Sequence, residues 1–316
     1  MISVVIPVFN RPQGAHRAIR SVLGQRGLIA QDLEVIVVDD CSDPPLVLAD
    51  TDRRVRLIGL ECNAGAAGAR NAGIRAAAGE FIAFLDSDDV WLPDKLAAQM
   101  LALQTAEDDQ KRRGDAAPLA VVCGFYCPDR RTGRLQRRMP APASSVAELA
   151  SGCWYNPGSA LLLRRATYDQ AGLLDEQLRR LEDLDWFVRF ALAGGRLLVA
   201  PVAGCVVAPS NSGAAHVIIE STRRIEDKFR PGGAVGLPPQ AWRRLKAYLA
   251  LERGAALSAG GDPLAAGLQM LQSLALKPRL QASVGNFWTR SDDVPPEIAE
   301  LYAQLAMPEP AMPRRL

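Results

Sequence analysis

Short apolar runs separated by segments with helical spacing form the amino-terminal part of the chain. The runs are rich in branched and aromatic residues and too short for buried helices, so they predict strands at 2–7, 33–38, 55–58 and 81–85. Between them, residues 12–24 carry apolar positions at helical spacing, and residues 66–78 form a helix of small residues. This alternation of strand and helix predicts an α/β fold with a mostly parallel, Rossmann-like sheet flanked by helices.

The pattern changes along the rest of the chain. A helix over 96–106 and a polar surface connection over 107–118 precede a second group of elements. That group comprises strands at 119–126, 159–164 and within 197–208, a hairpin turn at 130–133 and a helix at 182–193. After residue 217 the periodicity is helical, over 217–229, 240–256, 263–274 and 296–306. We therefore expect a C-terminal helical extension.

Composition narrows the possible partners and compartments. The 316 residues carry a formal net charge of only +2 and no long basic block, which argues against a nucleic-acid partner. Six cysteines without a CxxC pair and only two histidines argue against structural zinc and fit a reducing compartment, hence the cytoplasm. We expect no signal peptide before Ile2, and no run reaches the roughly 18 apolar residues that cross a bilayer.

The strand at 81–85 leads into three acids around a serine, Asp86, Ser87, Asp88 and Asp89. Because side chains alternate along a strand, Asp86 and Asp88 start on the same side. Paired carboxylates at a strand end can hold a hard divalent cation, which in turn can carry a phosphate. The alternative is a polar strand end leading into a helix that an aspartate caps.

Two other strand ends are also polar. In a parallel sheet they converge with Asp86–Asp89 on one edge, where ligands usually bind. Together they could grip a base, a ribose and a metal-bound diphosphate, although turn acids are common at strand ends. With Gly65, Arg70, Asp86 and Ser87 included, the candidate ligand-binding residues are Pro7, Phe9, Asn10, Arg11, Asp39, Asp40, Gly65, Arg70, Asp86 and Ser87.

Residues 63–73 form a glycine-rich segment that departs from the dinucleotide-binding pattern. Only Gly65 and Gly68 match GxGxxG, so a Rossmann cofactor is a poor interpretation. The glycines can instead permit close backbone approach, with Arg70 directed at a ligand. The alternative is a tightly packed helix start with a surface arginine.

A second acidic group, Glu182, Asp183 and Asp185, opens the helix predicted at 182–193. Acids are favoured at a helix N-terminus by the dipole alone. A general base also needs a carboxylate within reach of an attacking hydroxyl. Spacing does not separate these two interpretations.

Five blocks in this order resemble glycosyltransferase family 2, which has the GT-A fold. They are VVIPVFN, VVDDCSD, NAG with ARNAGI, GEFIAFLDSDD, and GLLDE leading to EDLDW and Arg189. The resemblance extends over residues 1–215. It implies a GT-A catalytic domain at 1–216, divided into a nucleotide-sugar half at 1–115 and an acceptor half at 116–216, followed by the helical extension at 217–316.

The resemblance also implies an enzyme and its site. The activity would be inverting transfer of a sugar from a nucleotide-diphosphate sugar to a glycan, lipid-linked or similar acceptor. Pro7, Phe9, Asp39 and Arg70 would surround the base and ribose, and Asp86 and Asp88 would form a DxD motif for Mg²⁺ or Mn²⁺. Asp183 matches the catalytic base, Arg189 would support the acidic loop, and His216 is a loose match to a group near the metal or diphosphate.

Two other functions remain open. A catalytically silent protein of the same fold would bind a nucleotide sugar without transfer. A nucleotidyltransferase would need a glycine-rich basic loop after the first strand, and residues 10–14 fit that poorly. The region after residue 217 could close over the acceptor, form a homo-oligomer or contact a membrane peripherally. For its basic stretch at 242–248 we favour packing on the catalytic core.

Overall fold

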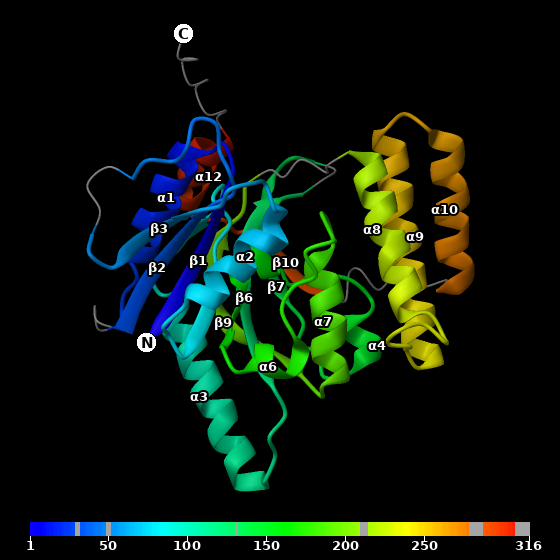
Figure 1. Cartoon of the computed structure of the whole chain (residues 1–316), viewed down its shortest axis with the longest axis horizontal. Coiled ribbons are helices and arrows are strands. Elements are labelled where there is room, and N and C mark those ends of the chain that lie inside the picture. Colours follow the sequence, from blue (N-terminus) through cyan, green and yellow to red (C-terminus); the bar gives the residue numbers. More distant parts are fainter. Residues whose placement is uncertain (29–31, 49–51, 130–131, 209–213, 278–286, 307–316) are drawn as a thin grey trace.

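A single mixed sheet organises the computed structural model, which describes residues 1–28, 32–48, 52–129, 132–208, 214–277 and 287–306. The strand order is β10-β7-β6-β8-β4-β1-β2-β3, with β9 pairing with β6 and β5. The helices pack around this sheet (Figure 1). The strands are β1 (Ile2–Val8), β2 (Leu33–Asp39), β3 (Val55–Gly59), β4 (Phe81–Phe84), β5 (Val90–Trp91), β6 (Leu119–Pro128), β7 (Leu135–Pro140), β8 (Leu162–Arg164), β9 (Arg196–Val206) and β10 (Trp288–Ser291).

The helices follow the chain in the order that the periodicity predicts, with three short ones in addition. They are α1 (Pro12–Leu23), α2 (Gly65–Ala76), α3 (Lys95–Arg113), α4 (Val146–Leu149), α5 (Pro157–Ala160), α6 (Thr167–Ala171), α7 (Glu182–Leu192), α8 (Ala215–Phe229), α9 (Pro239–Ala259), α10 (Pro263–Leu276) and α12 (Pro296–Ala306). No helix in the described ranges combines the length and the apolar character needed to span a bilayer.

The α/β class and the parallel centre of the sheet are confirmed. Strands β3, β2, β1 and β4 are mutually parallel, and β1 and β2 are buried along almost their whole length, as expected for strands covered on both faces. The second half adds antiparallel pairs, β4 with β8 and β6 with both β7 and β8. Strands from both halves, β1–β5 and β6–β9, thus build one continuous sheet.

Helix α2 packs unusually close to β1. A Cβ added at Gly73 would lie 2.3 Å from Val5 Cγ1, so only glycine allows this approach. Asn71, two residues earlier, donates to Leu174 O at 2.9 Å and accepts from Leu174 N at 3.0 Å. These contacts fix α2 between the first strand and the loop before α7, with Arg70 facing inward.

Two predicted elements were wrong. Residues 107–113 continue α3 as a helix, because their polar side chains face solvent and pair at i,i+3, and the helix ends at Gly114 with φ +66°. Ser159 and Ala160 lie in α5 instead of a strand, after Asn156 takes a left-handed conformation and Pro157 begins the helical turn. The hairpin turn predicted at 130–133 lies partly outside the described residues.

The segment after residue 217 is helical as predicted, with one addition. Helices α8, α9 and α10 run side by side at the opposite side of the molecule from β3 (Figure 1). Strand β10 then returns to the sheet and pairs antiparallel with β7, and α12 packs its Ile298 and Leu305 against Val206 and Tyr126. The division at 216/217 stays a prediction.

Candidate functional site

The ends of β1 and β2 are held together by hydrogen bonds from Asn10. Its backbone N donates to Ser42 Oγ at 2.8 Å, and its Oδ1 accepts from Asp43 N at 2.8 Å. Asn10 has φ +54°, a left-handed conformation that its short polar side chain tolerates better than most. Phe9 and Arg11 beside it are exposed, and Pro7 is half-buried. The predicted strand-end residues therefore share one edge of the sheet.

Asp39 and Asp40 organise the loops at this edge. Asp39 is buried and accepts from Ser42 N at 3.1 Å and Leu46 N at 2.9 Å. Asp40 accepts from Ala64 N at 2.6 Å and Gly65 N at 2.9 Å, at the start of α2. Burial raises the pKa of Asp40 although these two amides lower it. Contact of either aspartate with a base or ribose stays a prediction.

The three acids after β4 form a compact group. One carboxylate oxygen from each of Asp86, Asp88 and Asp89 lies within 4.8 Å of the others. Asp86 Oδ1 accepts from Arg70 Nη2 at 2.6 Å, and Asp88 forms an ion pair with Arg11. Burial, and then the negative charge of Asp86, raise the pKa of Asp88. The group therefore gathers negative charge that two arginines compensate only in part.

Asp89 forms the buried back of this group. It accepts from Ser159 Oγ at 2.5 Å and from Ala208 N at 2.8 Å. The same Ser159 Oγ accepts from Asp86 N at 3.1 Å, so one hydroxyl positions two of the three acids. Burial raises the pKa of Asp89 well above its usual range, and the charges of Asp88 and Asp86 act in the same direction.

Hard oxygen ligands of this kind suit Mg²⁺ or Mn²⁺. Both carboxylate oxygens of Asp89 already accept hydrogen bonds from Ser159 and Ala208, so Asp89 is less available to a cation than Asp86 and Asp88. Within the described chain, Asp86 Oδ2 and Asp88 Oδ1 take no hydrogen bond from another side chain and remain open to a cation. The residues present therefore fit a divalent ion held chiefly by Asp86 and Asp88.

Arg70 connects this group to the acids of α7. It is 7% exposed, and its Nη1 donates to Glu182 Oε1 at 2.7 Å while Nη2 bonds to Asp86. Burial disfavours its charge, but the carboxylates of Asp86 and Glu182 outweigh this effect and raise its pKa. Arg70 Nε is buried without a hydrogen-bond partner in the described structure. The surface-arginine alternative is therefore wrong.

Asp183 lies in the first turn of α7, after Leu181 in a left-handed conformation. It is half-buried, and its Oδ1 accepts from Leu184 N at 2.7 Å. It lines a small pocket together with Arg70, Gly158 and apolar side chains. Gly158 lies directly against Asp86 Oδ2. Asp183 thus shares this pocket with Arg70 and Gly158, both of which contact Asp86.

Asp185 faces away from this pocket and anchors its walls. It is fully buried, and it pairs with Arg189 at 2.9 Å and with Lys228 of α8 at 2.7 Å. Arg189 also donates to Leu173 O at 2.8 Å. Arg189 therefore holds the loop before α7, in agreement with the support expected of it.

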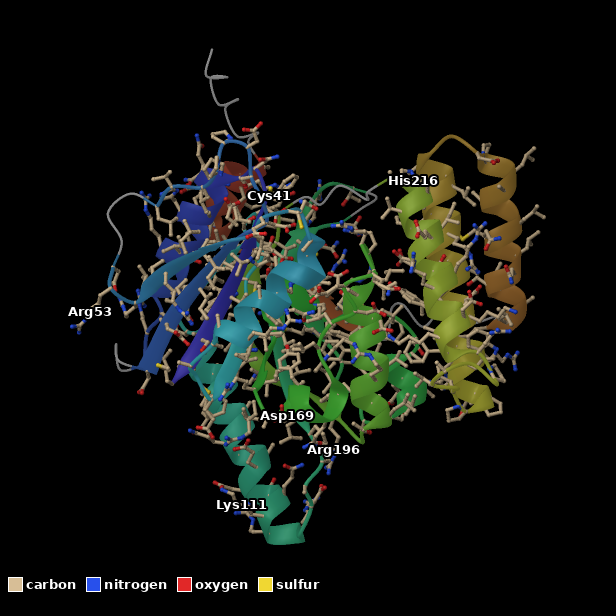
Figure 2. All side chains as sticks on the ribbon, in the orientation of Figure 1. Cys41, Arg53, Lys111, Asp169, Arg196 and His216 are labelled. Carbon is tan, nitrogen blue, oxygen red and sulfur yellow. The ribbon has the colours of Figure 1, made fainter. Side chains whose placement is uncertain are left out.

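His216 is not brought to the aspartates. It is exposed in the first turn of α8, and Figure 2 shows it where the chain enters that helix. The group of mutually close ligand atoms in the described residues consists of the three aspartates without His216. The reason is that α8 belongs to the helical layer outside the sheet. A metal or diphosphate role for His216 stays a prediction.

The sequence pattern includes Asp89 in the acidic strand end but gives it no role of its own, and it misses Ser159 and Gly158. Ser159 and Gly158 lie 69 to 73 positions from Asp86 and Asp89 along the chain, and nothing in their spacing indicates the contact. Ser87, which was expected to bind the donor, has a buried side chain.

Comparison with known proteins gives consistent similarities. The model of Glycosyl transferase family 2 matches residues 3–110. The succinoglycan biosynthesis protein ExoO of Rhizobium meliloti is 37% identical over 214 residues, which cover 65% of this chain and 60% of that protein. The Escherichia coli UDP-Glc:alpha-D-GlcNAc-diphosphoundecaprenol beta-1,3-glucosyltransferase WfgD is 40% identical over 103 residues, 32% of this chain and 40% of that protein.

The chain therefore spans between 40% and 60% of the length of these two relatives. Among solved structures, S. aureus TarS 1-349 in complex with UDP-GlcNAc aligns with a TM-score of 0.49 and 16% sequence identity. That alignment covers 90% of this chain and 91% of the TarS chain.

Proposed function

We propose that the protein transfers a sugar from a nucleotide-diphosphate sugar to an acceptor hydroxyl, with inversion at the anomeric carbon. The match of residues 3–110 to the model of Glycosyl transferase family 2 supports this proposal. The observation that carries the proposal is the position of Arg70. It bonds to Asp86 at 2.6 Å and to Glu182 at 2.7 Å, and it lines the same pocket as Asp183. One buried guanidinium thus lies between a cation-binding group and a candidate base.

Asp183 is the proposed general base. Its Oδ1 is engaged by Leu184 N, which orients the carboxylate and leaves Oδ2 for the hydroxyl of an acceptor in the pocket. As the acceptor oxygen attacks the anomeric carbon, its proton passes to Asp183 and the bond to the donor diphosphate breaks. A single displacement of this kind inverts the anomeric centre.

The departing diphosphate gains negative charge in the transition state, and positively charged groups of the site must stabilise that charge. Arg70 supplies a buried positive charge at this point, where low dielectric strengthens its effect. Mg²⁺ or Mn²⁺ held by Asp86 and Asp88, when bound, would act as a Lewis acid on the same leaving group. Ser159, which donates to Asp89, accepts from the backbone N of Asp86 and so helps to position that ligand.

For the donor we propose a UDP-sugar, bound along the edge that carries Pro7, Phe9, Asn10, Arg11, Asp39, Asp40, Gly65 and Ser87. Support comes from WfgD, whose name specifies UDP-Glc and whose similarity to this chain covers 103 residues. The same name specifies a diphosphoundecaprenol acceptor. We therefore favour a glycan or lipid-linked acceptor for this protein.

We further propose that residues 1–216 carry the catalytic residues, with the donor half at 1–115 and the acceptor half at 116–216, and that 217–316 form a C-terminal segment that completes the sheet through β10. A cytoplasmic location, with peripheral contact at the inner face of the membrane, fits this activity. All six cysteines are unbonded, as in proteins of a reducing compartment.

The test compares the Asp183→Asn variant with wild type in UDP-sugar binding and in transfer. We expect unchanged donor binding, and transfer lower by about 10²–10⁴. Asp169→Asn is the matched control, because Asp169 is an exposed acid on α6 (Figure 2) and should leave both quantities unchanged. Full transfer by Asp183→Asn would remove that residue from the base role.

The silent-protein alternative predicts a different result. Wild type would then bind a UDP-sugar and neither transfer nor hydrolyse it with Mn²⁺ present. Absence of binding to every UDP-, GDP- and TDP-sugar, measured by thermal shift, would contradict both functions.

A further inference from the structure

Helix α10 presents an uncharged, apolar face to the outside of the molecule. Its 14 residues, Pro263–Leu276, include no Asp, Glu, Lys, Arg or His. Leu264, Leu268 and Leu271 are 83%, 67% and 64% exposed. Their i, i+4, i+7 spacing puts them on one side of the helix, and exposed Gly267 and Ala275 lie among them. We call these five residues the α10 stripe.

The opposite side of α10 packs against α9. Ala266 and Ser273 are buried, and Ser273 Oγ donates to Ala247 O of α9 at 2.8 Å. Ala266 O approaches Gly254 of α9, where a Cβ would lie 3.3 Å away. The helix is therefore already anchored without the stripe, and the three leucines contribute little to the fold.

Single exposed leucines are ordinary on protein surfaces, but a continuous apolar stripe marks an interaction site. The stripe also lies on the outermost helix, on the far side of α9 from α8 (Figure 1). From Leu264 to Ala275 the stripe extends for about 16 Å, at a rise of ~1.5 Å per residue.

Cations gather at the C-terminal end of the stripe. Arg243 of α9 donates to Leu276 O, the last residue of α10. Lys277 follows immediately, and both its burial and the charge of Arg244 lower its pKa, which indicates that the two cations are neighbours. We call Arg243, Arg244 and Lys277 the basic cluster. Cations favour a helix C-terminus, but one would suffice for that effect.

We propose that the α10 stripe and the basic cluster form a docking surface for a bilayer that contains anionic phospholipid. The leucines enter the boundary between headgroups and acyl chains, and the three cations bind headgroup phosphates. This is peripheral contact by a helix lying on the surface. It rests on the proposed function only for the peripheral membrane contact named there, and vesicle binding can fail while donor binding and transfer are retained.

The charges favour lipid over a second copy of the chain. An antiparallel partner would set the basic cluster against Asp262, a single carboxylate that already caps α10 by accepting from Ala265 N at 3.0 Å. A bilayer supplies many phosphates beside the same apolar region. The stretch 242–248 does not itself offer an apolar face, since Leu245 is buried and Trp242 and Tyr248 pack inward against it.

The test is co-sedimentation of the full chain with vesicles of phosphatidylcholine, with and without phosphatidylglycerol. We expect wild type to bind the phosphatidylglycerol vesicles more tightly, and added salt to weaken this binding. Replacing Leu264, Leu268 and Leu271 together by Gln should reduce binding by about tenfold or more. The Arg243→Gln, Arg244→Gln, Lys277→Gln variant should remove the preference for phosphatidylglycerol.

A matched control replaces three exposed leucines elsewhere, Leu57, Leu101 and Leu192, by Gln. It should bind vesicles like wild type. Circular dichroism melting verifies that each variant folds, and the lipid and salt dependence of wild type provides a readout that needs no variant. Equal sedimentation with both vesicle types, or wild-type binding by the stripe variant, would overturn the proposal. So would a concentration-dependent dimer that the stripe variant abolishes without vesicle binding in wild type.

Discussion

Small side chains determine how closely the charged residues of the site approach one another. Gly158 is the clearest case, because a Cβ there would lie 2.2 Å from Asp86 Oδ2 and 3.1 Å from Arg70 Nη2. The Asp86 carboxylate occupies the space that a Cβ at position 158 would need, so its orientation depends on this glycine. A residue far from the DxD motif in the sequence thus controls the motif's geometry.

For Gly158→Ala we expect displacement of the Asp86 carboxylate and weaker binding of Mn²⁺ by about tenfold, which corresponds to ~1.4 kcal/mol. Calorimetric titration with Mn²⁺ measures this effect. Gly59→Ala is the control, because a Cβ at Gly59 meets nothing within 4 Å. Equal Mn²⁺ affinity in both variants would show that Asp86 does not depend on Gly158.

The buried surroundings of Lys95 change the pKa of its side chain. Its ammonium is fully buried, donates to Gln99 Oε1 at 2.7 Å, and lies 3.7 Å from the centroid of the Trp91 ring. Burial lowers the pKa of Lys95 from its ordinary value of 10.5. Between the lowered value and 10.5 the folded protein holds fewer protons than the unfolded chain, so the free energy of unfolding rises with pH.

Lys95→Met should lack this alkaline rise. The free energy of unfolding of wild type, measured by denaturant titration, should increase relative to that of the variant as pH approaches 10.5, by about 1.4 kcal/mol for each unit of pKa shift. Lys111→Met serves as control, because the Lys111 side chain is 77% exposed. Parallel pH profiles of wild type and Lys95→Met would contradict the prediction.

Among the elements, α7 connects the site to the helices that follow it. Its Leu184 and Val188 pack with Ile225 and Phe229 of α8 in a core separate from that of the sheet. Beside this core, Lys228 bonds to Asp175 at 3.0 Å and to the fully buried Asp185 at 2.7 Å. The helix that carries Asp183 is therefore held partly by α8.

Lys228→Met should lower the free energy of unfolding by about 1–3 kcal/mol, because it leaves Asp185 buried with only Arg189 as a cation partner. The estimate stays below that for a fully buried pair because the Lys228 side chain is 24% exposed. Arg224→Met, in an exposed pair with Glu220, should change it by less than about 1 kcal/mol. Denaturant titration compares the two, and equal losses would count against this role of Lys228.

Across the whole molecule, the C-terminal segment is interleaved with the rest. Strand β10 pairs with β7, and Phe287 stacks on Trp154 with ring centroids 4.4 Å apart. Trp288 Nε1 also donates to Trp154 O. The sheet therefore extends into residues that the periodicity placed in a helical extension.

A chain of residues 1–216 should accordingly fold poorly. It would expose the edge of β7, Trp154 and the α7 surface that packs on α8, and such edges promote aggregation. We expect a broadened, less cooperative melting transition by circular dichroism, and aggregation by light scattering. A truncated chain that melts as sharply as the full protein would support an independent unit at 1–216.

The sequence by itself determined the order of the elements and the identity of the main acids. Apolar runs fold locally into β1, β2 and β4, and the acids at 86–89 and 182–185 follow directly from neighbouring residues and from the family resemblance. Only the tertiary structure decided the partners of Arg70, the bridge from Ser159 to Asp86 and Asp89, the return of β10, and the exposed stripe on α10. These depend on contacts between residues tens to more than a hundred positions apart, which no local periodicity encodes.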